Sequence, residues 1–470
     1  MPVNLRRLIR WIAGAALVVC CAACGAGRPD PTSTPIPTIV QTPTATPLPT
    51  LTPVPTPVPG VLFVDGAQEL GPISPYVYGS CYGPWVNISV DLLPQAEASG
   101  VTYLRFPGGE WGDQYDLKDF HIDRFIDLAR RMGAEPQINV RMPGGSPETA
   151  AELVRYCNVT NDYNVRYWAI GNEPDLYAGF QRYGYDSYDT VRYNREWREI
   201  AEAMRAVDPD ILLLGPGTSQ YTGDPEADPR DEAGRDWVRE FLLANGDLVD
   251  VVAVHRYPFP TSMTGPPRTI ADLRANSREW DTIIPNLRAL IRETTGRDLP
   301  VAISEVNSDW SHAIGGEATP DSFYNAIWWG DVLGRMIRQK VDIVAYFLLQ
   351  CHAGQGGWGL LAKYEVRPTY YVYQMYKHFG DELLYASSDD PDVSIYAARR
   401  KDGALTLMLV NLGPEEACKP LHLENVTPAG PADVWLFDIE HQAEQIGAQT
   451  ITDGAEIALP PQSISLYVIP

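Results

Sequence analysis

Between residues 101 and 349, short apolar runs alternate with longer segments in which apolar residues recur every three or four positions. The short runs have the length of buried strands, and the longer segments have the period of amphipathic helices. The expected strands are 76–79, 101–106, 136–140, 165–170, 211–214, 249–254, 301–304 and 341–349, and the expected helices are 122–132, 147–156, 190–207, 237–243, 283–294 and 322–338. Alternation of this kind predicts a parallel sheet, and eight such units predict an α/β fold with a (β/α)8 TIM barrel over residues 60–382.

The pattern changes near residue 383. Short apolar runs at 393–398, 404–410, 421–424, 434–437, 455–459 and 464–469 are separated by turns, without a helical period between them. This predicts a C-terminal antiparallel β-sandwich over residues 383–470. A further run at 61–64 precedes the barrel. We expect it to pair with the sandwich, because a strand before the barrel has no other sheet to join.

The first 59 residues differ in composition from the rest. Three arginines precede an apolar run at 11–23 that is too short to span a bilayer, so residues 1–24 are expected to form a signal peptide. Residues 25–59 consist mainly of proline, threonine and small aliphatic residues. Such a segment cannot bury a core, so we expect a disordered, extended stalk.

The signal peptide ends in Cys-Ala-Ala-Cys, which resembles the lipobox of bacterial lipoproteins. This resemblance implies lipidation of Cys24, although Cys21 stands where the motif usually has leucine. An ordinary cleaved secretory signal is the alternative. Either way, we expect an extracellular or cell-surface protein whose contact with the membrane is through an N-terminal lipid anchor at most.

Composition narrows the classes of partner. A formal net charge of -23 excludes nucleic acid as the expected ligand, because affinity for nucleic acid comes from cationic contacts to phosphate. The cysteines after residue 24 are far apart, and we expect mostly buried thiols. No His, Cys and Asp cluster has metal-ligand spacing, and no phosphate-binding loop or Gly-x-Ser-x-Gly motif occurs. We therefore expect neither a metal nor a cofactor.

Chemically useful side chains follow the predicted strands. In a barrel, residues just after the strands meet at one mouth. Pro174 should end the fourth strand and leave Glu173 at its carboxyl end, and Glu305 ends the seventh strand. Two carboxylates across a pocket without a metal are best suited to glycoside hydrolysis. The other polar or aromatic residues at the mouth are Arg105, Arg141, Asn172, His255, Tyr257 and Trp358.

Around these residues the chain, from about residue 73 to 380, resembles the clan A retaining glycoside hydrolases. The motifs that carry the resemblance are Leu-Arg-Phe-Pro-Gly-Gly at 104–109, Asn-Glu-Pro at 172–174, His-Arg-Tyr-Pro at 255–258 and Ile-Ser-Glu-Val-Asn at 303–307. The appended sandwich is similar to that of families 39, 51, 79 and 30. Val306 departs from these families, which often have a bulky or aromatic residue there.

The resemblance implies a role for each matched residue. Glu173 would be the general acid/base, Glu305 would be the nucleophile, and Asn172 would hold the sugar 2-hydroxyl. Tyr257 and Arg105 would hydrogen-bond Glu305 and keep it ionised. A retaining mechanism requires carboxyl groups ~5–5.5 Å apart.

Several of these residues also have a structural interpretation. Arg105 could tie strand ends together, and His255 could be a core histidine rather than a site residue. Among the loop aromatics, most tyrosines between residues 177 and 188 should pack the loop onto the barrel, whereas Trp310 and Trp358 are the better candidates for walls of a sugar cleft. Arg141 or Arg256 would favour a uronic acid if either side chain pointed into the pocket.

The sequence as a whole predicts a retaining glycoside hydrolase that cleaves O-glycosidic bonds of poly- or oligosaccharides by double displacement with two glutamates. A non-catalytic carbohydrate-binding surface protein is one alternative. A transglycosylase that uses the same site is another. The motifs specify the clan rather than a sugar, a linkage, or an exo or endo mode of action.

Overall fold

The computed structural model describes residues 58–259, 266–352 and 356–470. The expected signal peptide, the lipobox with Cys24 and nearly all of the expected stalk lie outside the described residues. Within the described part, no helix is both long enough and apolar enough to cross a membrane.

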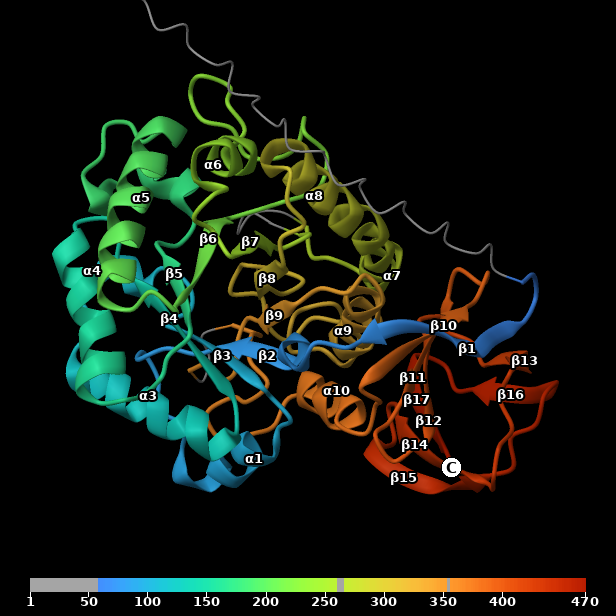
Figure 1. Cartoon of the computed structure of the whole chain (residues 1–470). Coiled ribbons are helices and arrows are strands. Elements are labelled where there is room, and N and C mark those ends of the chain that lie inside the picture. Colours follow the sequence, from blue (N-terminus) through green and yellow to red (C-terminus); the bar gives the residue numbers. More distant parts are fainter. Residues whose placement is uncertain (1–57, 260–265, 353–355) are drawn as a thin grey trace, which may run out of the picture. The chain divides into compact units, whose positions relative to one another are not determined.

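Eight parallel strands form a closed barrel in sequence order from β2 to β9, with helices around it (Figure 1). The strands are β2 (Gly79–Cys81), β3 (Tyr103–Phe106), β4 (Glu135–Val140), β5 (Tyr167–Ile170), β6 (Leu212–Thr218), β7 (Val251–Arg256), β8 (Val301–Val306) and β9 (Ile343–Tyr346). The predicted TIM barrel is confirmed. Glu173 and Glu305 follow or end its fourth and seventh strands, as the sequence indicated.

The start of the first barrel strand differs from the prediction. Residues expected as a strand at 76–79 lie mostly in a single 3-10 turn, Pro75–Tyr78, and the strand begins only at Gly79. Pro75 at the first position and the Ser74 hydroxyl, which accepts from the Tyr76 N–H, favour the turn. Gly79 is required because a Cβ there would lie 2.2 Å from the carbonyl oxygen of Val344 on the neighbouring strand.

The helices are α1 (Leu93–Ala98), α2 (Trp111–Gln114), α3 (Asp119–Met132), α4 (Pro147–Val154), α5 (Thr190–Val207), α6 (Trp237–Asn245), α7 (Ile270–Asn276), α8 (Trp280–Thr295), α9 (Phe323–Arg338) and α10 (Pro368–Tyr376). Local sequence sets their ends. Ser146, Asp189 and Ser322 each cap a helix by accepting a backbone N–H of its first turn. The predicted α5 is matched at both ends.

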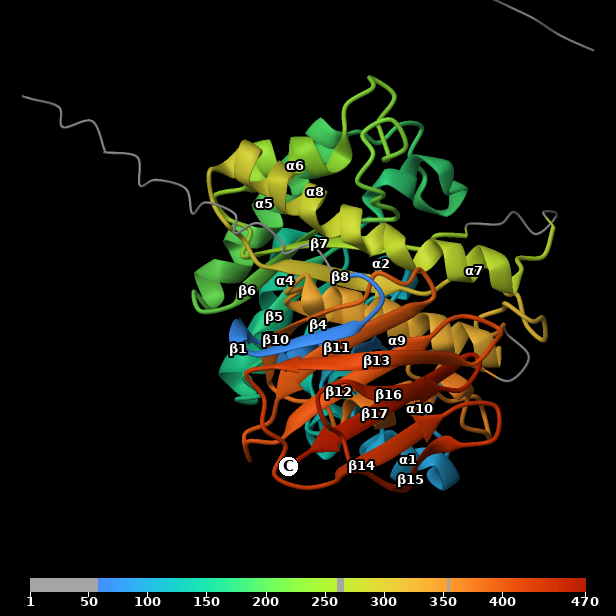
Figure 2. The same ribbon diagram turned by 90° about the vertical axis from the view of Figure 1, so that its right-hand side faces the viewer.

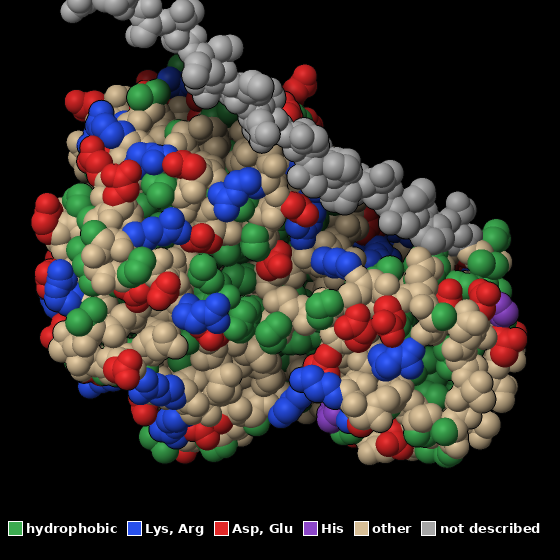
Figure 3. All heavy atoms as spheres, in the orientation of Figure 1, with side chains coloured by type: hydrophobic (Ala, Val, Ile, Leu, Met, Phe, Trp, Pro, Cys, Tyr) green, Lys and Arg blue, Asp and Glu red, His purple; other side chains and the backbone are tan. Residues whose placement is uncertain are grey.

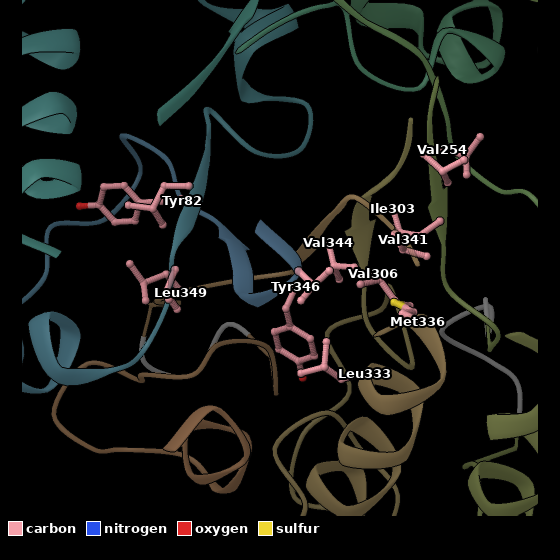
Figure 4. Packing of buried hydrophobic residues seen from close by; sticks show 14 of the residues in the cluster. Tyr82, Val254, Ile303, Val306, Leu333, Met336, Val341, Val344, Tyr346 and Leu349 are labelled. Carbon is pink, nitrogen blue, oxygen red and sulfur yellow. The ribbon is translucent and has the colours of Figure 1, made fainter. Parts of the chain in front are cut away.

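The barrel strands bury both faces, so they carry apolar side chains outward to the helices as well as inward. On one side, Ile303 of β8 and Val344 of β9 share a core with Leu333 and Met336 of α9 (Figure 4). This packing fixes β8, which carries Glu305 near its end.

The remaining strands form one nine-stranded sheet in the order β15-β14-β17-β12-β11-β10-β1-β13-β16 (Figure 2). They are β1 (Leu62–Pro72), β10 (Glu382–Ser387), β11 (Val393–Arg399), β12 (Leu405–Asn411), β13 (Ala417–Glu424), β14 (Ala432–Phe437), β15 (Gln442–Gln449), β16 (Ala455–Leu459) and β17 (Ser463–Ile469). Val434 of β14 and Leu459 of β16 share one apolar core although their strands are far apart in the order, so the sheet folds over on itself.

The strand before the barrel joins this sheet, as predicted. Val64 of β1 pairs with Ala386 of β10 in an antiparallel ladder and with Leu423 of β13 in a parallel one. On the face shown in Figure 3, lysine and arginine side chains are scattered among aspartate and glutamate. The described cysteines Cys81, Cys157 and Cys351 are buried and Cys418 is exposed, all as free thiols.

Candidate active site

A sharp turn at the end of β5 presents Glu173 to the mouth of the barrel. Gly171 and Glu173 both have a left-handed backbone, with φ of 78° and 50°, and Pro174 then starts a 3-10 helix. Glycine is required at 171 because a Cβ there would lie 2.5 Å from the Tyr177 hydroxyl oxygen. The Glu173 N–H donates to the Gly217 carbonyl at 2.9 Å, which fixes the turn against β6.

Glu305 is held by donors on both carboxylate oxygens. Nη1 of Arg105 lies 2.6 Å from Oε2, and the Gly109 N–H donates to the same oxygen at 3.2 Å. The Tyr257 hydroxyl donates to Oε1 at 2.6 Å. The structure therefore brings the predicted Arg105 and Tyr257 onto Glu305, in the positions that would keep this carboxyl ionised.

The two carboxyl groups have opposite pKa shifts. Burial, followed by the negative charges of Glu305, Asp175 and Glu110, raises the pKa of Glu173 well above its ordinary value. Burial would also raise the pKa of Glu305, but contacts with His255 and Arg105 and the Tyr257 hydrogen bond lower it below its ordinary value. These opposite shifts favour a protonated Glu173 beside an ionised Glu305, which is the division of roles that acid and nucleophile require.

His255 lies between the two glutamates and is fully buried. Its Nδ1 is 3.0 Å from Oε1 of Glu173 and 4.0 Å from Oε2 of Glu305. Burial lowers the pKa of His255 to about 3, so the imidazole is neutral at neutral pH. His255 can therefore lower the pKa of Glu305 by its charge only in acid, whereas Arg105 is a permanent cation beside Glu305. His255 is a site residue rather than an isolated core histidine.

Glu173, His255 and Glu305 each offer one atom that could bind a metal, and these three atoms lie within 4.8 Å of one another. In the part of the chain that the structure describes, this is the one group of three such residues close enough to share a metal ion. The Arg105 guanidinium already bonds Glu305 and would repel a cation. The site thus suits a pair of carboxyl groups acting directly better than it suits a metal.

Asn172 is positioned by two contacts. Its Oδ1 accepts from Nη2 of Arg105 at 2.6 Å, and its backbone N–H donates to Oδ2 of Asp113 at 2.7 Å. The Nδ2 group is buried and has no hydrogen-bond partner among the described residues. Asn172 therefore offers a donor toward a ligand, in keeping with its predicted role.

Asp113 and Glu110 are site residues that the sequence did not indicate. The buried Asp113 carboxylate accepts from the Tyr177 hydroxyl at 2.6 Å and from the Met142 N–H at 3.0 Å, besides the Asn172 N–H. Glu110 forms an ion pair with Arg182 at 2.8 Å. Glu110 precedes α2 and Asp113 lies within it, and neither has a recognisable spacing to Glu173 or Glu305. The nearest signal in the sequence is the Pro-Gly-Gly turn at 107–109.

A cleft of about 180 Å³ lies beside the segment after β3 that contacts Glu305. Its lining includes Gly109, which donates to Glu305, together with Trp85, Trp111 and Trp358. The Trp358 indole N–H donates to the Asp309 carbonyl at 2.8 Å, so the ring is held in place. Trp358 thus lies where a cleft wall was expected. Trp310 is 47% exposed and is not among the residues that line this cleft, so its role stays a prediction.

The two arginines that would have favoured a uronic acid have local partners. Nη1 of Arg141 lies 3.0 Å from Oδ1 of Asp116. Arg256 binds Glu279 through two hydrogen bonds of 3.0 and 2.6 Å. Neither guanidinium is directed at Glu173 or Glu305 by these contacts.

Comparisons with known proteins agree with this geometry. Residues 154–427 match the family model of the glycosyl hydrolases family 39. The chain is 26% identical over 255 residues to an intracellular exo-alpha-(1->5)-L-arabinofuranosidase of Streptomyces lividans, covering 42% of this chain and 37% of that protein. It is 26% identical over 354 residues to a beta-xylosidase of Geobacillus stearothermophilus, covering 64% of each protein. The chain thus spans between about a third and two thirds of the length of these two relatives.

Solved structures show the same fold. An alpha-L-arabinofuranosidase from Thermotoga maritima superposes with a TM-score of 0.68 at 20% identity, over 87% of this chain and 99% of that one. CelM2, a bifunctional glucanase-xylanase from a metagenome library, superposes with a TM-score of 0.69 at 19% identity, over 87% and 98%. Because these superpositions cover 87% of the chain, they include both the barrel and the appended sheet.

Proposed function

The chain belongs to glycosyl hydrolases family 39, as the resemblance to clan A predicted, and from this we propose that it is a retaining glycoside hydrolase. One observation carries the proposal. Glu173 and Glu305 each place a carboxyl oxygen within 4.8 Å of the other, and their pKa values are shifted in opposite directions. So close an approach of the two oxygens fits the ~5–5.5 Å separation of carboxyl groups in retaining enzymes better than the ~6.5–9.5 Å of inverting ones.

In the first step, Oε1 or Oε2 of ionised Glu305 attacks the anomeric carbon while protonated Glu173 gives its proton to the leaving oxygen. The glycosidic C–O bond breaks and a glycosyl ester of Glu305 forms. The ester carries no charge, so one of the charges that raise the pKa of Glu173 is lost at this moment. Glu173 then acts as the base that takes a proton from the water that cleaves the ester.

The surrounding residues support these steps. Arg105 and Tyr257 keep Glu305 ionised before attack and stabilise the carboxylate as it is released. The free Nδ2 donor of Asn172 suits the 2-hydroxyl of the reacting sugar. Neutral His255 orients the Glu173 carboxyl through its Nδ1 contact.

For the substrate we propose a glycoside of a neutral sugar. The relatives are an arabinofuranosidase and a beta-xylosidase, so xylosides and L-arabinofuranosides are the first compounds to test. The local pairing of Arg141 and Arg256 removes the argument for a uronic acid.

The test is hydrolysis of a panel of aryl glycosides by the parent and by Glu305→Ala and Glu173→Ala. Each variant should lose activity by about a thousandfold or more. Glu416→Ala, which removes an exposed glutamate in the sheet region, is the matched control and should retain activity. If both site variants keep full activity on a glycoside that the parent cleaves, the proposal is wrong.

Two other outcomes would identify the alternatives. Glycan binding without hydrolysis of any substrate would favour a carbohydrate-binding protein. Transfer to an added acceptor sugar in place of release to water would favour a transglycosylase that uses the same two glutamates. Product analysis by mass spectrometry separates these cases from hydrolysis.

We further propose, from the sequence motif alone, that the protein is exported and lipidated at Cys24. Incorporation of labelled fatty acid into the parent but not into Cys24→Ser would support this. Release of the unlabelled parent into the medium would instead favour an ordinary secretory signal.

A further inference from the structure

Trp111, the first residue of α2, lies between two hollows of the surface. One is the cleft of about 180 Å³ beside Gly109 and Glu305. The other is an open hollow of about 500 Å³ that is lined by Trp111, Tyr115, Asp116 and Arg141, among others. Since Trp111 lines both, the two hollows meet at this ring, and neither Glu173 nor Glu305 lines the second one.

The second hollow offers an exposed aromatic surface, whose most accessible ring is Tyr115. Tyr115 is 54% exposed, and its ring centroid lies 5.2 Å from that of Trp111 with the planes 42° apart. Two neighbouring rings, one of them more than half exposed, form an apolar surface that a ligand can cover. The apolar C–H face of a sugar ring is a ligand that stacks on such rings.

Polar groups stand beside these rings. Arg141 and Asp116 form an ion pair of 3.0 Å, and both line the hollow. Nε of Arg141 donates to the Pro143 carbonyl at 2.7 Å, so the guanidinium is fixed in orientation. Donors and acceptors side by side suit neighbouring sugar hydroxyl groups, each of which both donates and accepts hydrogen bonds.

Both segments also belong to the catalytic face. Trp111 and Tyr115 follow β3, and Arg141 follows β4, so all three lie at the carboxyl ends of strands, where the glutamates also lie. A chain bound in the cleft beside Glu305 can therefore run across Trp111 into the second hollow without leaving the mouth of the barrel.

We propose that the hollow formed by Trp111, Tyr115 and the Asp116–Arg141 pair binds a further sugar unit of the substrate, remote from the bond that is cleaved. The inference rests on the proposed function and makes it more specific. The substrate is an oligo- or polysaccharide that is held through more than the reacting sugar, rather than a single terminal sugar on an arbitrary leaving group.

The test compares kcat/KM on aryl β-xyloside and aryl α-L-arabinofuranoside with that on linear xylo- and arabino-oligosaccharides of increasing length. Within the series whose sugar the protein cleaves, kcat/KM should be about tenfold higher for the longest oligosaccharide than for the aryl glycoside. Tyr115→Ala should lower kcat/KM on the longest oligosaccharide about tenfold, mainly through KM, and by a much smaller factor on the aryl glycoside. Asp116→Ala should have the same selective effect.

Leu243→Ala is the control for loss of an exposed apolar side chain. Leu243 is 59% exposed near the end of α6, on the side of the barrel where β7 begins, so it should not alter length dependence. If kcat/KM does not rise with length, or if Tyr115→Ala reduces activity equally on short and long substrates, the inference is wrong while the proposed hydrolase stands.

A binding measurement tests the proposed sugar site independently of catalysis. Titration of an uncleaved oligosaccharide into Glu305→Ala, with and without Tyr115→Ala, should show a Kd about tenfold higher for the double variant. Equal Kd values would overturn the inference. If the parent cleaves no glycoside but this difference in Kd is found, the hydrolase fails and the sugar site stands.

Discussion

Nη1 of Arg105 lies 2.6 Å from Oε2 of Glu305, and both side chains are almost completely buried. Because almost no water reaches either side chain, the Arg105 guanidinium takes the place of solvent in stabilising the negative charge of Glu305. The ionised state of Glu305 therefore depends on this contact. Through Nη2 the same guanidinium also holds Asn172. One arginine of the second barrel strand therefore joins the ends of the fourth and seventh strands.

Arg105→Met should abolish activity near neutral pH and lower the free energy of unfolding by about 3–5 kcal/mol, because it leaves a buried carboxylate without its partner. Loss of the cation raises the pKa of Glu305, so any residual activity should appear only at higher pH. Arg105→Lys keeps the charge and should be less damaging. Urea denaturation and a pH–activity profile measure both effects. Unchanged stability and profile would show that the ion pair is dispensable.

Glu110→Gln should move the alkaline limb of the pH–activity profile to lower pH. The negative charge of Glu110 is one of the causes, after burial, Glu305 and Asp175, that raise the pKa of Glu173. Its removal lowers that pKa, and Arg182, freed from its ion pair, acts in the same direction. Glu173 then loses its proton at lower pH. Glu416→Gln should leave the limb in place, and a limb that moves upward in Glu110→Gln would contradict the explanation.

His255 should stay neutral throughout the working range of the enzyme. Burial lowers its pKa to about 3, whereas the unfolded chain takes up this proton near pH 6.5. As the pH falls from about 6.5 toward 3, only the unfolded state takes up a proton on His255, so the free energy of unfolding decreases. Nitrogen NMR shifts of His255 should show a neutral ring down to about pH 4. His255→Gln should flatten the loss of stability in acid, and a ring that titrates near pH 6.5 would contradict this.

Asp113→Asn should lower kcat more than it raises KM, although Asp113 lies behind Asn172 rather than on the carboxyl pair. The carboxylate accepts from three donors, the N–H groups of Asn172 and Met142 and the Tyr177 hydroxyl. An asparagine must turn its NH2 toward one of them, which costs about 1–3 kcal/mol and loosens the turn that holds Glu173. Tyr177→Phe removes one donor only and should have a smaller effect. Equal kcat values for parent and Asp113→Asn would show that the turn needs no such anchor.

The sequence was informative where burial and chemistry leave a linear pattern. Barrel strands bury both faces, so they appear as apolar runs, and Pro174 marks the strand end that carries Glu173. The helix at 190–207 could be predicted to the residue because Asp189 caps it and its apolar face is periodic. The same two glutamates that stood out in the sequence lie together in the structure.

What could not be predicted depends on partners far along the chain. Asp113 bonds residues 29, 59 and 64 positions away, and no local pattern encodes such contacts. Strand β15 is polar and exposed, so it lacks the alternation that identifies a strand. The directions of Arg141 and Arg256 were open for the same reason, because Asp116 and Glu279 decide them.

Helix α9 gives a prediction that runs against local propensity. Gly334 lies within this helix, and a Cβ at that position would come within 2.3 Å of the Tyr396 ring on β11. The same ring carries a hydroxyl that donates to Oδ1 of Asp331 on α9 at 2.5 Å, so the helix and the sheet are locked together at this point. In an exposed helix, Gly→Ala stabilises by about 1 kcal/mol.

Here Gly334→Ala should instead destabilise by about 1–3 kcal/mol, because the methyl group forces α9 away from the Tyr396 ring. A smaller residue in place of the ring should relieve the clash, so the free energies of unfolding of Gly334→Ala, Tyr396→Leu and the double variant should not add. Since α9 also packs against β8, which carries Glu305, Gly334→Ala should lower kcat together with stability. A variant more stable than the parent would show that helix and sheet do not meet at Gly334 as closely as the structure has them.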